Sequence, residues 1–420
     1  LIFIPLFLGI FYGFVTLICS FFSLKKNFST ILIFAIIFSS IEFVRSFFLG
    51  GFPWNLIAYS WTNYLNSLQI LSSIGTYSFN LFSITAFLMP LIIIFNKSLR
   101  FKLTSFTILI IILLSNHYYG VWKISQNKIL YKKNTEYKIK VISPKIPIKR
   151  FFSPENPEEI IKELIDLSNP HHSEKTIFIF PEGILSSIYL RDLQNFKNLF
   201  SENYSDNHIL LMGINTKEKI NDKIKIYNSL VVLNKNIEIL AKYNKNKLVP
   251  FGEFLPLENL FLKFGLKKIT YGYQSFSPGN ERKVIKINNF KFIPLICYEI
   301  IYSGKLLKEN KDFDYIINIS EDGWFGDSVG PYQHFSHSIF RSIEEGKNLI
   351  RSANSGISAY IIPTGEVISK IKSTEKGVIE INNFVKSKNT LFNVQGNKMF
   401  FYFLSIYISL FFFLKKKENR

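Results

Sequence analysis

The sequence predicts an α/β domain inserted between the spans of a multi-span α-helical membrane domain. Long uncharged apolar runs lie near both ends of the chain, and short β-rich runs alternate with helix-compatible stretches between them. Of the 420 residues, 48% are hydrophobic, which excludes a disordered chain. With 15 Pro and 21 Gly, the composition also excludes collagen-like and low-complexity classes.

Five apolar runs are candidate transmembrane helices. At a rise of about 1.5 Å per residue, about 20 residues cross the hydrocarbon core of a bilayer. The last two runs are shorter and need bilayer thinning, flanking anchors or extension into their aromatic borders, with a buried core helix as the open alternative. Glu42 and Arg45 interrupt the second run three residues apart, so we expect them to pair. The runs are 1–22, 31–48, 70–95, 103–115 and 399–414.

Three short basic clusters predict the orientation of these spans. Lys and Arg in short loops mark the cytoplasmic side, and the three clusters fall on one side of the predicted membrane. The insert from about 116 to 398 is then extracytoplasmic. The chain begins at Leu1 rather than Met, so we expect upstream sequence to be missing. The clusters are Lys25 and Lys26; Lys97, Arg100 and Lys102; and Lys415, Lys416, Lys417 and Arg420.

The net charge of +19 does not predict a nucleic-acid partner. Lys, Asn, Ile and Phe are all abundant, which indicates a biased genome, and no basic cluster is interleaved with aromatics as in a nucleic-acid groove. The two cysteines, Cys19 and Cys297, exclude a disulfide framework. We expect Cys19 to be a packing residue within the first span.

The insert has the alternating pattern of an α/β domain. Helical spacing is seen over 158–167 and 337–347. The candidate strands are 138–142, 176–180, 208–212, 229–233, 283–287, 291–296 and 315–319.

Three segments of the insert carry residues with distinctive chemistry. Glu182 follows a buried run directly after Pro181, and Cys297 ends the apolar run before Tyr298 and Glu299. Each has an ordinary explanation, because such a glutamate is more often a cap and such a cysteine more often a small apolar filler. Loop lysines are usually only solvated. The lysines ahead of the Pro-Phe-Gly-Glu turn are Lys242, Lys245 and Lys247.

Together an acid, a lysine and a cysteine suffice for acyl transfer. A thiol with a reference pKa of about 8.5 needs a base or a cation to attack an acyl carbon at neutral pH. Glu182 is the candidate base, and a lysine can stabilise both the thiolate and an oxyanion. The sequence has no G-x-S-x-G elbow and no Cys-His pairing near Cys297, so the other hydrolase triads have weaker support.

The histidines do not predict a metal site, and we predict no cofactor. None of them has a partner at the spacing of metal ligands. The histidines considered are His171, His172, His334 and His337.

Several motifs resemble known families. PEG at 181–183, YNKNKLVPFGEFLP at 243–256 and CYEI at 297–300 resemble the Glu, Lys and Cys segments of the carbon-nitrogen hydrolase (nitrilase) superfamily. LVPFGEF, ICYE, the flanking spans and GFPWN at 51–55 resemble its membrane-bound apolipoprotein N-acyltransferase family. The segments 318–335 and 351–359 add further support.

The resemblance implies roles for six residues. Glu182 matches the general base, Lys245 the oxyanion-stabilising lysine and Cys297 the nucleophile. Lys245 is preferred to Lys247 because the family's lysine stands eight residues before the Glu of the PFGE turn. The supporting site residues are Glu253, Tyr298 and Glu299.

The resemblance also implies the architecture and the reaction. It implies a nitrilase-like αββα sandwich facing the periplasm from the bacterial inner membrane, with membrane helices over 1–118, the catalytic domain over 119–397 and a last helix with a basic tail over 398–420. Only about five of the family's eight spans are visible. The implied enzyme transfers a fatty acyl chain from a membrane phospholipid, through a Cys thioester, to the N-terminal amino group of a diacylglyceryl-cysteine apolipoprotein. This is the last step of lipoprotein maturation.

The chain departs from the family pattern at a few positions. Phe152 stands where the family has a Trp, PEG replaces PET or PES, and Glu321 with Gly323 replaces Asn and Ala before WFGD. We expect none of these replacements to touch the three chemical roles.

Two other functions remain as alternatives. A membrane-tethered nitrilase or amidase that hydrolyses a small amide shares the three residues, and the spans and GFPWN argue against it. A non-catalytic membrane scaffold is disfavoured by the presence of all three.

Overall fold

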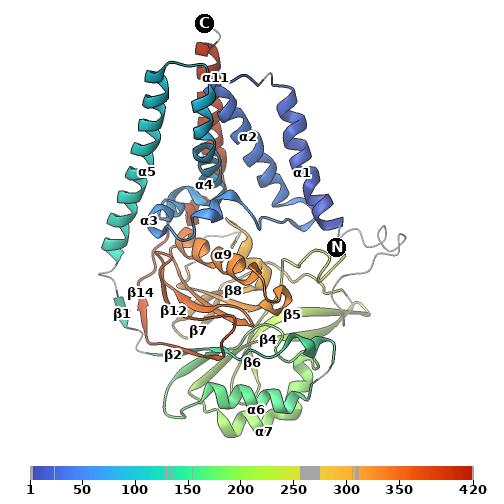
Figure 1. The fold of residues 1–420 in the computed structure, drawn as a ribbon. Coiled ribbons are helices and arrows are strands. Elements are labelled where there is room, and N and C mark those ends of the chain that lie inside the picture. Colours follow the sequence, from blue (N-terminus) through green and yellow to red (C-terminus); the bar gives the residue numbers. More distant parts are fainter. Residues whose placement is uncertain are drawn as a thin grey trace.

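The computed structural model describes residues 3–22, 24–127, 131–133, 136–153, 155–255, 275–304, 306–307 and 312–418. Long helices form one end of the molecule and a layered α/β domain forms the other, with the C-terminus at the far end of the helices (Figure 1).

The apolar runs form the long helices. Among the described residues, four helices are long and apolar enough to cross a membrane, and the apolar stretch Pro5–Ser20 is shorter. The last two runs reach the length of a span by extension into their borders, one of the expected solutions: α5 has 29 residues and α11 has 21. A buried core helix is contradicted, since 0% and 11% of their apolar windows are buried. The helices are α1 Phe3–Ser20, α2 Phe28–Arg45, α4 Leu71–Leu88 with η3 Met89–Ile94, α5 Leu99–Asn127 and α11 Lys398–Glu418.

The basic clusters lie at the end of the helices away from the α/β domain (Figure 1). Lys25 and Lys26 lie between α1 and α2, and Lys97 precedes α5. Lys415, Lys416 and Lys417 of the third cluster lie in the last turn of α11, where lysines also complement the helix dipole; Arg420 lies outside the described residues. The three clusters therefore share one side, as their spacing predicted.

A polar cluster joins the membrane helices to the loop that contains GFPWN. Arg45 pairs with Glu42 at 3.4 Å, as expected from their spacing, and donates to Asn55 Oδ1 at 2.7 Å. Asn80 of α4 donates to Glu42 Oε2 at 2.6 Å and accepts from the Ala58 N–H. Because a polar group inside a bilayer needs a partner, this cluster holds α2, α4 and the loop together.

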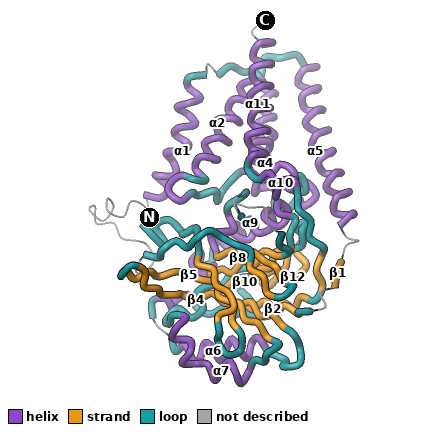
Figure 2. The backbone as a smooth tube through the Cα atoms, turned by 180° about the vertical axis from the view of Figure 1, so that it is seen from behind, coloured by secondary structure: helices purple, strands orange, loops and turns teal. Residues whose placement is uncertain are grey.

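The α/β domain is a four-layered sandwich. Within the described residues two six-stranded sheets run in the orders β13-β2-β3-β4-β5-β6 and β12-β11-β10-β9-β8-β7. Isoleucines of both sheets, such as Ile179 of β3 and Ile317 of β9, share the core between them. Helices α6 (Pro157–Ser168) and α7 (Lys197–Asn203) cover one sheet and α9 (Gly330–Glu345) covers the other (Figure 2). The predicted αββα sandwich is confirmed.

All seven predicted strands are present. β4 and β5 extend beyond their predicted ends to form a long hairpin. Strands β1, β6 and β10–β14 were missed; β10 is buried throughout, yet its sequence NLIRSAN is largely polar. The strands are β1 Tyr131–Lys133, β2 Lys138–Ser143, β3 Thr176–Ile179, β4 His208–Ile220, β5 Lys223–Leu233, β6 Ile239–Asn244, β7 Ile285–Ile287, β8 Phe290–Ile296, β9 Tyr315–Glu321, β10 Asn348–Asn354, β11 Ser358–Ile361, β12 Val367–Ile371, β13 Gly377–Ile381 and β14 Asn383–Val385.

Shorter helical segments complete the connections and the junction. They are η1 Phe48–Gly50, η2 Ile57–Trp61, α3 Leu65–Leu68, η4 Ile148–Phe151, η5 Leu190–Phe196, η6 Cys297–Ile301, η7 Asp322–Phe325 and α10 Leu391–Gln395.

Helix α9 fastens the sandwich to the membrane helices. Arg341 of α9 donates to Thr76 Oγ1 at 2.6 Å, and Glu344 accepts from the Thr76 N–H and hydroxyl at 2.6 Å each. Just before Thr76, α4 is interrupted at Gly75, whose φ is 73°. A Cβ at Gly75 would lie 2.0 Å from the ring of Phe392 in α10, so the break in α4 and the seat of α10 depend on this glycine.

We expect Gly75→Ala to destabilise the protein by about 2–4 kcal/mol, because it adds both backbone strain and overpacking. The measurement is the thermal unfolding of the detergent-solubilised chain. Gly13→Ala in α1 is the matched control, because nothing lies within 4 Å of a Cβ there. An equal Tm for the two variants would contradict the assigned role of Gly75.

Candidate active site

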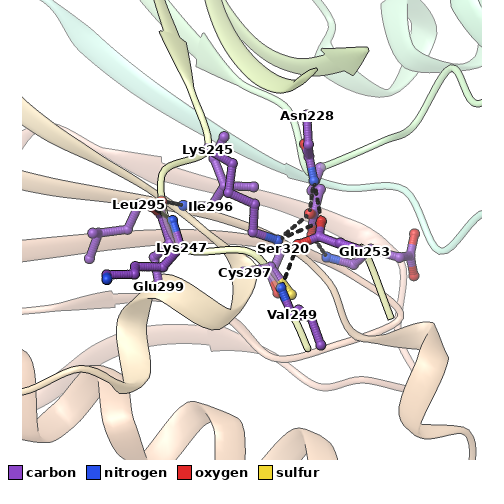
Figure 3. Close-up of polar contacts among 12 residues, drawn as sticks. Asn228, Lys245, Lys247, Val249, Glu253, Leu295, Ile296, Cys297, Glu299 and Ser320 are labelled. Carbon is purple, nitrogen blue, oxygen red and sulfur yellow. Dashed lines mark hydrogen bonds and ion pairs between the residues drawn. The ribbon is translucent and has the colours of Figure 1, made fainter. Parts of the chain in front are cut away.

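The three chemical residues follow strands from both sheets. Glu182 follows β3 and Lys245 follows β6 in one sheet, and Cys297 follows β8 in the other. Figure 3 shows that Lys245, Glu253 and Cys297 converge, whereas the side chain of Lys247 points away from them. The sandwich therefore brings together residues that are far apart in the sequence.

Cys297 stands at a sharp turn between β8 and the 3₁₀ helix η6. Its φ is 50°, a left-handed conformation that costs a non-glycine residue energy and is typical of functional sites. Glu299 supports the turn, because its carboxylate accepts the Ile296 N–H at 2.8 Å. The turn leaves Cys297 partly accessible to solvent.

Glu182 is 6% exposed, and both of its carboxylate oxygens have donors. Asn228 Nδ2 donates to Oε1 at 2.6 Å, and Lys245 Nζ lies 3.3 Å from the same atom. Oε2 accepts the backbone N–H of Glu321 at 2.8 Å. These donors hold the carboxylate in one orientation while its backbone stays at the end of β3.

Lys245 lies 1% exposed between two carboxylates. Its Nζ is 2.9 Å from Glu253 Oε1 and 3.3 Å from Glu182 Oε1. Burial opposes its charge, but Glu182 and Glu253 outweigh burial and hold the pKa of Lys245 well above its usual value. The lysine is therefore a fixed cation, as an oxyanion requires.

The surroundings of Cys297 raise the pKa of its thiol. Desolvation by the surrounding protein raises it most, and the Glu182 carboxylate raises it further, although Lys245 opposes both. A hydrogen bond with Ser320 also favours the thiolate, without reversing the shift. These surroundings favour the protonated thiol, so a neighbouring base has a proton to remove.

The two supporting glutamates have different positions. Glu253 contacts Lys245 and Asn228, and its Oε2 accepts the Val249 N–H at 2.9 Å. Glu299 is fully buried on the other side of Cys297, where it holds the loop that carries Lys245. The donors to Glu299 are Tyr243, Arg282, Ile296 and the backbone N–H groups of Asn246 and Lys247.

Tyr298 points toward the membrane helices. Its hydroxyl donates to Gly51 O at 2.6 Å and its ring stacks on Phe52 at 6.5 Å. Trp54 of the same GFPWN loop stacks on His334 of α9 at 5.3 Å. The loop between the second and third long helices therefore lies directly beside the nucleophile turn.

Sequence reasoning missed two groups of residues that surround the site. His334 Nε2 lies 3.3 Å from Cys297 O, within hydrogen-bond distance. Asp322 holds the other ring nitrogen at 2.9 Å, and Arg351 binds Asp322 at 2.7 Å. Burial lowers the pKa of His334 despite the neighbouring Asp322 carboxylate. The second residue that the sequence analysis missed is Asn228, which donates to both Glu182 and Glu253.

No spacing rule could have identified these residues. His334 lies on α9 and Asn228 in the middle of β5, and neither is near a chemical residue in the sequence. Among the described residues, no cluster of three or more His, Cys, Asp and Glu side chains could hold a metal ion.

One replaced position contacts the site through its backbone. The N–H of Glu321 binds Glu182, but any residue other than proline has this N–H, so the expectation that the replacements leave the three chemical roles intact stays a prediction. Phe152 lies 56% exposed against Trp324, with ring centroids 6.3 Å apart.

Two family models match this chain, one over its N-terminal helices and one over its α/β domain. Residues 1–89 match the model of the apolipoprotein N-acyltransferase N-terminal domain, and residues 177–382 match the carbon-nitrogen hydrolase model.

Similar relatives match nearly the whole chain. An apolipoprotein N-acyltransferase of Rickettsia prowazekii is 35% identical over 367 residues, which cover 86% of this chain and 71% of that protein. One of Brucella melitensis is 28% identical over 384 residues, which cover 90% of this chain and 71% of that protein. With a relative of this identity and coverage, and with both parts matched, the chain belongs to the apolipoprotein N-acyltransferase family, acyltransferases with a nitrilase-like domain on a multi-pass membrane region.

Proposed function

We propose that Cys297, Glu182 and Lys245 carry out the acyl transfer of lipoprotein N-acylation in two steps. In the first, Glu182 takes the thiol proton as Cys297 Sγ attacks the ester carbonyl of a membrane phospholipid. Lys245 stabilises the oxyanion of the tetrahedral intermediate. Collapse breaks the ester C–O bond, the leaving oxygen takes the proton from Glu182, and a thioester and a lysophospholipid result.

The second step transfers the acyl chain to an amine. The α-amino group of a diacylglyceryl-modified N-terminal cysteine attacks the thioester carbonyl, and Glu182 accepts a proton from the attacking nitrogen. The C–S bond breaks, the sulfur leaving group takes that proton, and an amide is released. Glu182 and Cys297 return to their starting protonation states, so the cycle balances.

The meeting of Glu182, Lys245 and Cys297 at strand ends of the two sheets is the observation that carries this assignment. Burial and Glu182 raise the pKa of the Cys297 thiol, so attack calls for a base that takes its proton. Glu182 meets this need, since it is buried, oriented by Asn228 and the Glu321 N–H, and electrostatically coupled to the thiol.

The position of the site supports substrates that stay in a membrane. Lipid and lipoprotein substrates follow from the family; we propose a phospholipid donor and a diacylglyceryl-cysteine acceptor. Phe52 and Trp54 lie between the long helices and the nucleophile turn, where acyl chains held in the bilayer would reach the site.

We propose that the sandwich faces the periplasm from the inner membrane. The basic clusters at the opposite end of the helices support this orientation. We further propose the functional division into membrane helices over 1–118, a catalytic domain over 119–397 and a C-terminal helix with a basic tail over 398–420.

Cys297→Ala should abolish N-acylation, because it removes the sulfur that we propose as the nucleophile. The measurement is mass spectrometry of a lipoprotein N-terminus after reaction with the purified enzyme. Cys19→Ala, at the other free cysteine, is the control and should keep full activity. Normal triacylation by Cys297→Ala would exclude the proposed nucleophile, and release of free fatty acid alone by the unaltered enzyme would favour a hydrolase.

Lys245→Met should lower kcat by about 10²–10³-fold, the usual cost of removing an oxyanion-stabilising group. Lys247→Met is the matched control, since the Lys247 side chain is exposed only two residues away. Steady-state kinetics of both variants test the choice between them. A larger loss of kcat in Lys247→Met than in Lys245→Met would mean that Lys247 stabilises the oxyanion, against our proposal.

Alkylation of Cys297 by iodoacetamide should be slow at pH 7 and still rising above pH 9, because the raised pKa leaves little thiolate at neutral pH. Lys245→Met should slow it further, since Lys245 lowers the pKa of the thiol. The rate is followed by mass spectrometry in a Cys19→Ala background. A rate already constant below pH 7 would mean that the thiolate is stored at rest.

A further inference from the structure

A buried ion pair lies directly behind Glu182. Glu321, 1% exposed, pairs with Arg150, 2% exposed. Glu321 is also the residue whose backbone N–H binds Glu182 Oε2 at 2.8 Å. Its side chain and its main chain therefore connect Arg150 to the carboxylate that acts as base in the proposed function.

Arg150 reaches both backbone segments that flank Glu182. Besides Glu321, its guanidinium donates to Gly183 O at 3.4 Å, directly after Glu182. It also donates to Pro147 O at 3.0 Å and Ile146 O at 3.2 Å, which anchors it in the chain around η4. One side chain thus ties the end of β9 to the turn after β3.

Both oxygens of the Glu321 carboxylate accept hydrogen bonds. Oε1 accepts the Gly323 N–H at 2.8 Å, and Oε2 accepts from Arg150 and from Asn354 Nδ2 at 2.9 Å. An amide of the same size has only one oxygen, so its NH₂ group would face a donor at one of the two ends. Burial raises the pKa of Glu321 to about 7, against the opposing effect of Arg150.

Gly323 leaves the space that Glu321 occupies. A Cβ at Gly323 would lie 2.6 Å from Glu321 Oε1 and 3.3 Å from Ile148. The close neighbour of this Cβ would be an oxygen of the Glu321 carboxylate. Three donors hold that carboxylate through its two oxygens, so it cannot move away without losing them.

We propose that the Arg150–Glu321 pair, with the space left at Gly323, is a positioning device that holds the Glu321 N–H on Glu182 and so keeps the general base aimed at Cys297. This inference rests on the proposed role of Glu182. A general base must stay within hydrogen-bond reach of the proton that it takes. Displacing the Glu321 N–H should therefore slow proton removal.

The first test is Glu321→Gln. We expect kcat to fall about tenfold or more with little change in KM, because the change affects the chemical step and not the binding of the phospholipid. The readout is acyl-thioester formation on Cys297 from a fluorescent phospholipid in detergent micelles. Glu345→Gln is the matched control: Glu345 is also buried, its pKa is also raised to about 7 by burial, and its partner Asn393 is outside the site.

The second test uses the steric coupling between Gly323 and Glu321. Gly323→Ala alone should lower kcat, because the methyl group displaces the Glu321 carboxylate. Glu321→Gln combined with Gly323→Ala should lower kcat by less than the product of the two single losses, because both changes disturb the same contact. A merely destabilising alanine would multiply the two losses.

The outcomes separate this inference from the proposed function. If Glu182→Gln forms the thioester normally, the base assignment fails and the positioning role fails with it. If Glu182→Gln is inactive but Glu321→Gln keeps the kcat of Glu345→Gln, the positioning role alone is overturned. A lowered kcat together with the smaller combined loss in the double variant supports it. Thermal unfolding of each variant confirms that folded enzyme is compared.

Discussion

The structure of the site depends on one buried cation. Lys245 is enclosed between Glu182 and Glu253, and both carboxylates are in turn held by Asn228. Two carboxylates and one ammonium group leave an excess negative charge next to Cys297. The Glu182 carboxylate is one reason why the pKa of the Cys297 thiol is raised. Without Lys245 the two buried carboxylates would lose their cation, so this lysine stabilises the site at rest as well as the oxyanion that we propose.

The membrane helices are part of this arrangement. Tyr298, the residue after the nucleophile, donates to Gly51 of the GFPWN loop, and Trp54 of that loop stacks on His334. His334 in turn holds the carbonyl of Cys297. Below this contact, Arg341 and Glu344 of α9 fasten the sandwich to α4 through Thr76. A movement of the helices would therefore reach the strained turn of Cys297, which connects substrate access at the membrane with the chemistry.

Much of the site was predictable because strand ends and motifs are local. Glu182, Lys245 and Cys297 each follow a β-rich run, and the resemblance of the flanking segments identified their roles. The same reasoning failed for residues that act through space. Asn228 lies within β5, His334 on α9 and Arg150 in η4, and each looks like an ordinary polar residue in its own segment. Glu321 was recognised as a replacement, yet its contact with Glu182 through the backbone has no signature in the sequence.

Apolar runs, basic loops and strand periodicity were sufficient for the order of spans and strands, because these properties depend on neighbouring residues and on the solvent that each segment meets. They were insufficient for the lengths of α5 and α11, where polar flanks continue the helix, and for β10, whose polar residues are buried because distant groups satisfy them. The packing of two sheets decided which carboxylate meets which donor. That choice depends on contacts across more than a hundred residues of sequence, such as Arg150 with Glu321, and such contacts exist only once the sandwich has formed.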